Sequence, residues 1–374
     1  MIDSGAIFLP GLRLKYPNDM YDYDVILSFI TAFTLTYFAI PSVIHVAKVK
    51  NLVDVPGGRH VHTEVTPSLG GFAIFAGMMF SILLWTPFAQ YGGDMQYILC
   101  AFVIIFLIGA KDDIVPVAAN KKLVGQIFAA SILFFKAEVQ ITGFHGVMGV
   151  EQLPFGVMAL LTIFTILVII NGFNLIDGIN GLSGSIATLI CGTLGIWFLL
   201  IKRYDLAIIA FSTAGAVIAF LKYNYTPAKI FMGDTGSLLI GLACAILTIN
   251  FIEINNVLEN QHPWKINAGP AVAFGILIFP LFDTLRVFIT RALSGRSPLS
   301  PDRNHIHHLL IDTGVSHMKA TTILVFVNMV FIILVFMMAQ YTDTLSLLIL
   351  VMSVALVMMA GLFYYVSRNR LREA

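Results

Sequence analysis

Charged residues are scarce in this sequence. Asp, Glu, Lys and Arg make up 11% of its 374 residues, whereas hydrophobic residues make up 58%. A soluble globular domain carries about 25% charged residues, because much of its surface faces water. The shortage of charge excludes a soluble globular chain and indicates a polytopic membrane protein.

Cysteine pairs, a signal peptide and sequence repeats are also lacking. Cys100, Cys191 and Cys244 lie inside apolar runs without paired spacing, so neither a disulfide framework nor a cysteine metal site is indicated. Residues 1–23 have no basic start, apolar middle or small-residue cleavage site, so we expect the first apolar segment to be retained. No repeat, low-complexity tract or linker divides the chain, and we expect a single domain over residues 1–374.

Long apolar runs are abundant instead. A transmembrane helix needs about 20 mainly apolar residues to cross a hydrocarbon core of about 30 Å. We therefore expect an all-α polytopic membrane protein with about eleven transmembrane helices. The predicted spans are 24–46, 69–90, 95–110, 122–141, 154–171, 178–201, 205–221, 231–252, 268–290, 319–340 and 344–366.

The basic residues predict how these spans are oriented. Short loops rich in Lys and Arg stay on the cytoplasmic side of a membrane. If the N-terminus lies outside, one side collects 15 of the 22 Lys and Arg residues and the other side collects 6. The sequence therefore predicts an external N-terminus and a cytoplasmic C-terminus.

The distinctive polar motifs fall in five loops on the predicted cytoplasmic side. The external loops carry no comparable group of polar residues, so this distribution is the main indication of function. The five motifs are DVPGGRHVHTEVTPSLGG (54–71), KDDIVPVAANKK (111–122), NGFNLIDGINGLSG (171–184), KYNYTPAKIFMGDTGS (222–237) and RALSGRSPLSPDRNHIHHLL (291–310).

Four aspartates in these loops are candidates for chemistry. Asp112 and Asp113 follow directly on an apolar span, at a depth where an unpaired carboxylate is costly; ordinary pairing with flanking lysines is the alternative. Asp177 lies in a glycine-rich break between two spans, and irregular backbone at this depth is tolerated where it is buried or lines a wet cavity. Asp234 opens a span, where helix capping is the alternative explanation.

The available ligand types favour a hard cation. Mg²⁺ is commonly held by one or two carboxylates, with water and substrate phosphates at its other positions. Thiolates are absent, although His305, His307 and His308 keep zinc open as an alternative. These histidines share their loop with Arg291 and Arg303, and guanidinium groups match phosphate oxygens, so we expect this loop to bind phosphate. Contact with anionic lipid is the alternative for the arginines.

The loop motifs resemble those of a known family. KDDIVPVAANKKLVGQ, NGFNLIDGINGLSG, FMGDTGSLLIG and SPDRNHIHHLL resemble signature segments of the polyprenyl-phosphate N-acetylhexosamine-1-phosphate transferases. This superfamily includes the phospho-N-acetylmuramoyl-pentapeptide transferase of peptidoglycan synthesis. The first loop, with Arg59, His62, Pro67, Gly70 and Gly71, also resembles the family pattern, so the resemblance runs in order over residues 54–310.

The resemblance implies an enzyme of the bacterial cytoplasmic membrane with a cytoplasmic active site. Such an enzyme depends on Mg²⁺, with Mn²⁺ as a substitute, and moves a sugar 1-phosphate from a UDP-sugar onto undecaprenyl phosphate, releasing UMP. PDRNHIHH is similar to the branch that uses UDP-N-acetylglucosamine to initiate cell-envelope glycopolymers such as lipopolysaccharide. UDP-N-acetylgalactosamine and UDP-N-acetylmuramoyl-pentapeptide are alternative donors. The resemblance also implies a homodimer, and nucleic acid is not among the expected partners.

Each candidate residue has an expected role within this family. We expect Asp177 and Asp234 to hold Mg²⁺, with Asp113 nearby, and Asp112 to orient the attacking lipid phosphate and remove any remaining proton. Relatives commonly have aspartate at the position of Asn180, which we expect to contact the nucleotide or the sugar. The other expected substrate-binding residues are Arg59, His62, Lys122, Asn174, Arg291, Arg303, His305, His307 and His308.

A transporter is the alternative from another functional class. Transporters also place acidic residues and broken helices within a bundle, but near the midplane of the membrane. Here the acids gather at one predicted face, which favours an enzyme. We expect a single displacement, because a phosphate monoester with a second pKa of about 6 is already a nucleophile at neutral pH. A double displacement through an aspartyl-phosphate is the alternative.

Overall fold

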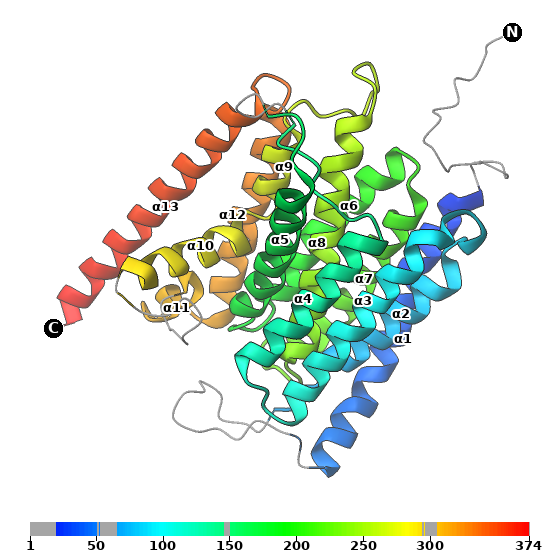
Figure 1. Ribbon diagram of the computed structural model, residues 1–374. Helices are drawn as coiled ribbons and strands as arrows, with labels where there is room; N and C mark the ends of the chain where they lie inside the picture. Colours follow the sequence, from blue (N-terminus) through cyan, green and yellow to red (C-terminus); the bar gives the residue numbers. More distant parts are fainter. Residues whose placement is uncertain are drawn as a thin grey trace, which may run out of the picture.

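The computed structural model describes residues 20–50, 52, 66–145, 150–293, 295 and 305–373. Within these ranges the protein is all-helical and contains no β-strand, which confirms the predicted fold class (Figure 1). The helices are α1 (Met20–Val49), α2 (Gly70–Trp85), α3 (Phe88–Ile114), α4 (Ala119–Lys136), α5 (Phe155–Ile176), α6 (Leu182–Leu200), α7 (Tyr204–Asn224), α8 (Gly233–Val257), α9 (Gly269–Ile276), α10 (Ile278–Leu293), α11 (Ile306–Ile311), α12 (His317–Met338) and α13 (Thr344–Glu373).

Each of the eleven predicted spans contains one helix or a pair of helices. In the described part of the chain, eight helices are long and apolar enough to cross a membrane, namely α1, α3, α5, α6, α7, α8, α12 and α13. The bent pair of α9 and α10 adds a ninth span if it crosses as one unit. Because α2 is shorter and α4 does not meet the same criterion, crossing by all eleven segments stays a prediction.

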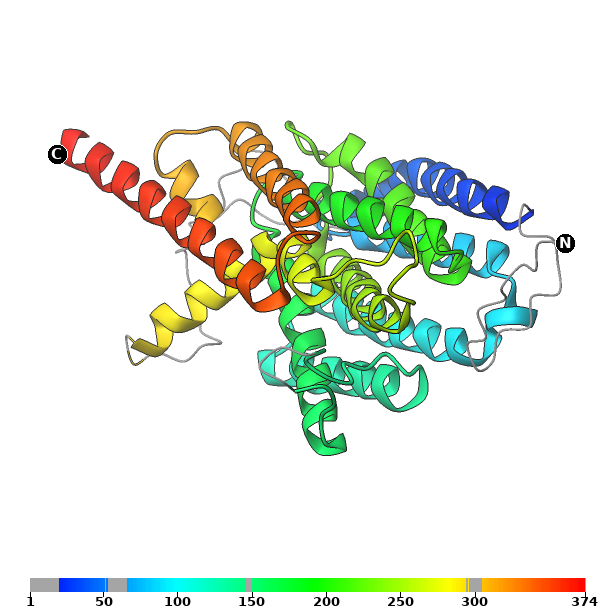
Figure 2. The same ribbon diagram turned by 90° about the horizontal axis from the view of Figure 1, so that it is seen from above.

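Helices α7 and α8 form the centre of the bundle. In their most apolar windows, 89% and 83% of the residues are buried inside the protein, compared with 28% for α1 and for α5. Helix α8 packs against α2, α3, α5 and α6, whereas α7 packs against α1, α2 and α6 (Figure 2). The outer helices expose apolar side chains such as Phe38 and Leu160, which suits contact with lipid acyl chains.

Glycines let α2 and α3 approach the first turn of α8 closely. A Cβ atom at Gly109 of α3 would lie 2.4 Å from the Cα atom of Thr235, and one at Gly71 of α2 would lie 2.2 Å from the backbone nitrogen of Gly236. Close approach through small residues is typical of helix packing in membranes. Backbone contacts on two sides therefore hold the start of α8.

The predicted span 268–290 is broken. Helix α9 ends at Ile276, α10 begins at Ile278, and the two are bent by 79° relative to each other. Buried Asn328 of α12 lies at the break, where its side-chain amide donates to the Ile276 carbonyl at 3.3 Å and its side-chain oxygen accepts the Phe279 N–H at 3.4 Å. These bonds replace backbone partners that hydrocarbon could not supply.

Replacing Gly109 with alanine is expected to destabilise the protein, because the added Cβ atom collides with α8. Gly192 of α6 provides a matched control, since a Cβ atom there meets nothing within 4 Å. Alanine stabilises a helix by about 0.5–1 kcal/mol relative to glycine where space allows. Thermal unfolding in detergent should therefore show a lower Tm for Gly109→Ala and an unchanged or higher Tm for Gly192→Ala. Equal Tm values for the two variants would contradict the close contact.

Candidate active site

All five polar motifs contribute to one cavity at a single end of the bundle. Its volume is about 540 Å³, within the range of roughly 300–1,000 Å³ that small-molecule sites occupy. The described residues that line it are Ser68, Asp112, Asp113, Pro116, Asn174, Asp177, Gly178, Ile179, Asn180, Asn224, Phe231, Met232, Gly233, Asp234, His308 and His317.

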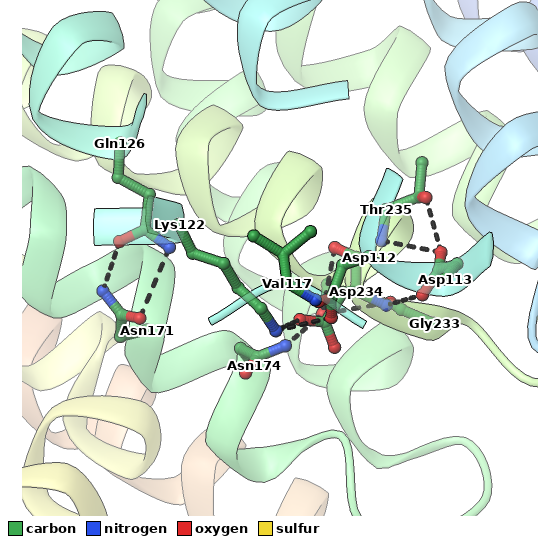
Figure 3. A network of polar contacts seen from close by, with 11 residues as sticks. Asp112, Asp113, Val117, Lys122, Gln126, Asn171, Asn174, Gly233, Asp234 and Thr235 are labelled. Carbon is green, nitrogen blue, oxygen red and sulfur yellow. Dashed lines mark hydrogen bonds and ion pairs between the residues drawn. The ribbon is translucent and has the colours of Figure 1, made fainter. Parts of the chain in front are cut away.

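Lys122 connects two of the candidate aspartates. Its Nζ atom lies 2.5 Å from Asp112 Oδ2 and 2.6 Å from Asp234 Oδ2, so one ammonium group donates to carboxylates from the ends of α3 and α8 (Figure 3). The other oxygen of Asp112 accepts the Val117 N–H at 2.7 Å. The ammonium group reduces the repulsion between the two carboxylates, but the group of three keeps a net negative charge.

Asp113 contacts the start of α8. Its Oδ1 atom accepts the Asp234 N–H at 2.7 Å, and its Oδ2 atom accepts the N–H and the hydroxyl of Thr235 at 3.0 and 2.5 Å (Figure 3). The first turn of a helix leaves such N–H groups without partners of its own. Asp113 therefore caps α8 from a neighbouring helix and fixes the position of Asp234.

Gly233 allows this approach. Its φ angle is +72°, and a Cβ atom there would lie 2.2 Å from the Ser68 carbonyl oxygen and 2.6 Å from Asp113 Oδ2. Glycine adopts this conformation without strain, and no residue with a Cβ atom leaves this space. The Gly70 N–H donates to the Phe231 carbonyl at 2.9 Å, so the first and fourth motifs are also joined through their backbones.

Asp177 lies directly after α5, in the turn between the spans α5 and α6. The Ser183 hydroxyl donates a hydrogen bond to its Oδ1 atom. Burial, together with nearby Asp234 and Asp113, raises the pKa of the Asp177 carboxyl to about 8. A carboxyl group in such surroundings needs a compensating cation to be fully ionised at neutral pH.

Two asparagines of the third motif hold neighbouring segments together. Asn174, one turn before Asp177, donates to the Ser237 hydroxyl at 3.0 Å. The Asn180 side-chain amide donates to the Thr226 hydroxyl at 2.9 Å, and its backbone carbonyl accepts the Thr321 hydroxyl at 2.8 Å. Both asparagines line the cavity, so they join α5, α8 and the fourth motif around it.

The three histidines of the fifth motif occupy different positions. His308 lines the cavity. His307 is fully buried beside Gly178, with its ring centre 4.2 Å from that of His308, and burial together with His308 lowers the pKa of His307 to about 3. His305 Nδ1 lies 2.8 Å from Asp283 Oδ2. Among these histidines, His308 is therefore the one placed to touch a molecule in the cavity, and His307 is neutral.

Three polar residues of this region were not singled out from the sequence. Asp283 of α10 is fully buried, and its Oδ1 atom accepts the Ile306 N–H at 3.0 Å, which anchors the start of α11. Asn224 accepts the Gly181 N–H at 2.6 Å, and His317 lines the cavity from the start of α12. Asp283 could have been identified from the sequence, because an acid inside an apolar span is a functional candidate. Asn224 and His317 lie at helix ends, where polar residues are common.

Besides Lys122, His305 and His307, four more predicted binding residues are not among the described residues that line the cavity. Arg59, His62 and Arg303 fall outside the described residues. Arg291, near the end of α10, is 4% exposed and is not among the described residues that line the cavity.

The donor set fits Mg²⁺ better than zinc. Within the described ranges, no group of three His, Cys, Asp or Glu side chains is arranged to hold a metal ion alone. Zinc sites usually need at least three such ligands, whereas Mg²⁺ is bound by one or two carboxylates with water and substrate phosphates. Both oxygens of Asp113 are engaged by α8, so Asp177 and Asp234 are the better candidates for contact with a cation.

Comparison with known proteins places this site in a family. The model of Glycosyl transferase family 4 matches residues 95–252. The chain is 31% identical over 332 residues to the probable undecaprenyl-phosphate N-acetylglucosaminyl 1-phosphate transferase of Bacillus subtilis (strain 168), and the match covers 87% of this chain and 88% of the relative. The chain belongs to glycosyl transferase family 4.

Further relatives in this family carry related names. The decaprenyl-phosphate N-acetylglucosaminephosphotransferase of Mycolicibacterium smegmatis is 31% identical over 79% of this chain and 77% of its own length. The undecaprenyl-phosphate alpha-N-acetylglucosaminyl 1-phosphate transferase of Escherichia coli (strain K12) is 30% identical over 74% and 73%. The resemblance to polyprenyl-phosphate transferases is thus confirmed, and the segment matched by the glycosyl transferase family 4 model contains Asp112, Lys122, Asp177 and Asp234.

Asp113→Asn and Asp177→Asn are expected to affect stability differently. An asparagine at 113 has one acceptor oxygen in place of two, so a donor of α8 loses its partner at a cost of about 1–3 kcal/mol. An asparagine at 177 still accepts from Ser183 and removes an ionisable group from a buried position. Thermal unfolding in detergent with EDTA should show a lower Tm for Asp113→Asn only. An unchanged Tm for that variant would contradict its capping role.

Proposed function

We propose that this chain transfers N-acetylglucosamine 1-phosphate from UDP-N-acetylglucosamine to undecaprenyl phosphate and releases UMP. The observation that carries the proposal is the bridge from Lys122 to Asp112 and Asp234, beside Asp177, in a cavity at the ends of apolar helices. The relatives from Bacillus subtilis and Escherichia coli are named for undecaprenyl phosphate and an N-acetylglucosaminyl 1-phosphate group. The lipid-linked product would initiate synthesis of a cell-envelope glycopolymer.

The charge of the cavity supports a role for a divalent cation. Lys122 offsets Asp112 and Asp234 only in part, Asp177 adds a further acid, and two phosphate-bearing substrates would add more negative charge. Members of the family generally depend on a divalent metal ion. We propose Mg²⁺, with Mn²⁺ as a substitute, at Asp177 and Asp234, with Asp113 nearby. When bound, the cation would neutralise phosphate oxygens and stabilise charge on the departing UMP.

The chain itself has little bond chemistry to perform. The lipid phosphate is mostly dianionic at neutral pH, because its second pKa is about 6. Its oxygen forms a bond to the β-phosphorus of the UDP-sugar while the bond from that phosphorus to the oxygen of UMP breaks, so the sugar keeps its phosphate. Asp112 takes up any remaining proton and holds Lys122, which neutralises charge on the phosphates. This assignment supports a single displacement that depends on positioning and electrostatics.

The polar groups around the acids support binding of the sugar nucleotide. Asn174, Asn180 and His308 line the cavity and carry amide and imidazole groups that suit nucleotide or sugar. His305 and His307 are buried behind this wall and would support His308. Phosphate binding by Arg291 and Arg303 is proposed from the match between guanidinium groups and phosphate oxygens. Substrate binding by Arg59 and His62 rests on the resemblance.

The proposal also covers location and assembly. Residues 1–374 would form one transferase domain, with the catalytic loops within 54–310, in the bacterial cytoplasmic membrane. The eight apolar helices support a multi-pass protein, and the bias of basic residues supports an external N-terminus and a cytoplasmic active site. A homodimer is proposed on the resemblance.

The transporter alternative has weaker support. A transporter site lies near the membrane midplane and is reached from each side in turn. The cavity described here instead lies among the ends of α3, α5 and α7 and the starts of α8 and α12. Acids gathered at one end suit a reaction between a lipid headgroup and a soluble nucleotide.

Release of UMP tests the proposal. Purified protein with undecaprenyl phosphate and Mg²⁺ should release UMP from UDP-N-acetylglucosamine faster than from UDP-N-acetylgalactosamine or UDP-N-acetylmuramoyl-pentapeptide. EDTA should stop the release, and Mn²⁺ should restore it. A preference for another donor would correct the sugar, whereas folded protein that releases no UMP from any donor would overturn the transferase proposal and favour a transporter.

Asp177→Asn tests the metal assignment. This variant should remain folded in the membrane and lose about 10³-fold or more in kcat, because charge stabilisation by a bound metal contributes several kcal/mol. Activity like that of the wild-type protein would remove Asp177 from the proposed metal site.

A further inference from the structure

A pair of amides, one of them buried and the other partly buried, joins α4 to α5 next to the Lys122 bridge. The Asn171 side-chain nitrogen donates to Gln126 Oε1 at 2.8 Å, and the Gln126 side-chain nitrogen lies 3.4 Å from Asn171 Oδ1 (Figure 3). The Asn171 amide also donates to the Leu167 carbonyl at 2.7 Å. Gln126 is 2% exposed. Two amides that bond reciprocally at this depth satisfy each other without water.

The pair lies one helical turn from residues of the proposed site on both helices. On α4, Gln126 follows Lys122 by four residues, so the two side chains lie on the same face. On α5, Asn171 precedes Asn174 by three residues and Asp177 by six. A contact at Gln126 and Asn171 therefore sets the distance and rotation of Lys122 relative to the acid-bearing end of α5.

Helix α4 packs against both α3 and α5, and on the α5 side few other polar groups fix how it is seated. Its outer face carries exposed apolar side chains, including Val124, Phe128 and Phe135. Within the described helices, the Gln126–Asn171 pair provides the side-chain hydrogen bonds between α4 and α5, and the rings of Phe134 and Phe155 add an apolar contact. Apolar contacts tolerate a slide or a rotation of one helix on another, whereas a reciprocal amide pair is satisfied in one register only.

We propose that Gln126 and Asn171 are positioning residues for phosphosugar transfer. Their pairing fixes the register of α4 on α5 and thereby keeps Lys122 Nζ between Asp112 and Asp234. The inference rests on the proposed function, because the pair is inferred to position Lys122 for that reaction. A pair that served stability alone would show a different pattern in the following variants.

Gln126→Met and Asn171→Leu replace each amide with an apolar side chain of similar size. Each single change leaves the other amide without its amide partner, so both stability and activity should fall. The double variant leaves no amide unpaired, and its Tm should recover toward the wild-type value. Its kcat should stay about 10²-fold low, with KM for the UDP-sugar little changed, because a displacement of about 1 Å at a reacting centre costs that much.

Thr162→Val is the matched control. Thr162 is a buried residue of α5 that accepts the Ile141 N–H at 2.9 Å, well away from the acids. Its replacement should lower Tm and leave kcat per folded protein unchanged. UMP release by the wild-type protein and by this control separates failure of the inference from failure of the proposed function.

The double variant decides the question. A kcat at or near the wild-type value in Gln126→Met/Asn171→Leu would overturn the inference, since stability alone would then account for the pair. The inference would also be overturned if the double variant and Thr162→Val had equally lowered Tm values and the double variant lost no more kcat than this control. A low kcat in a double variant that is as stable as the control supports the positioning role.

Discussion

The ammonium group of Lys122 between Asp112 and Asp234 is the interaction on which the rest of the active site depends. It joins α4 to α3 and α8. Without it, Asp112 of α3 and Asp234 of α8 would repel each other in a region of low dielectric constant. Two neighbouring contacts hold Asp234 in place for this interaction. Gly109 lets α3 pack closely against α8, and Asp113 caps the first turn of α8. Asp234 therefore has a fixed position before any substrate binds.

Much of this architecture could be predicted from the sequence. Scarce charge and long apolar runs identify a helical membrane protein, and the loop motifs identify the family. Asp112, Asp177 and Asp234 are functional candidates because placing an ionised carboxylate beside a membrane-spanning segment costs free energy. The structure brings all three to one cavity together with Asn174, Asn180 and His308.

Other features depend on three-dimensional contacts that one sequence does not display. Asp113 has the same sequence signal as Asp112, yet it bonds to the backbone of α8, because the direction of a side chain follows from helix packing. Gly275 and Pro280 flank the break at Leu277 and are sequence markers of a bend, but its angle of 79° follows from how the two helices pack. Gln126 and Asn171 reveal their relation only when α4 and α5 are side by side.

In the proposed reaction a sugar together with its phosphate, rather than the sugar alone, moves to the lipid. The most direct measurement uses UDP-N-acetylglucosamine labelled with phosphorus-32 in the β-phosphate, with undecaprenyl phosphate and Mg²⁺. After separation of lipid from water, we expect label in the lipid and unlabelled UMP in the water phase. Label that stays in the water phase as UDP, with sugar on the lipid, would contradict it.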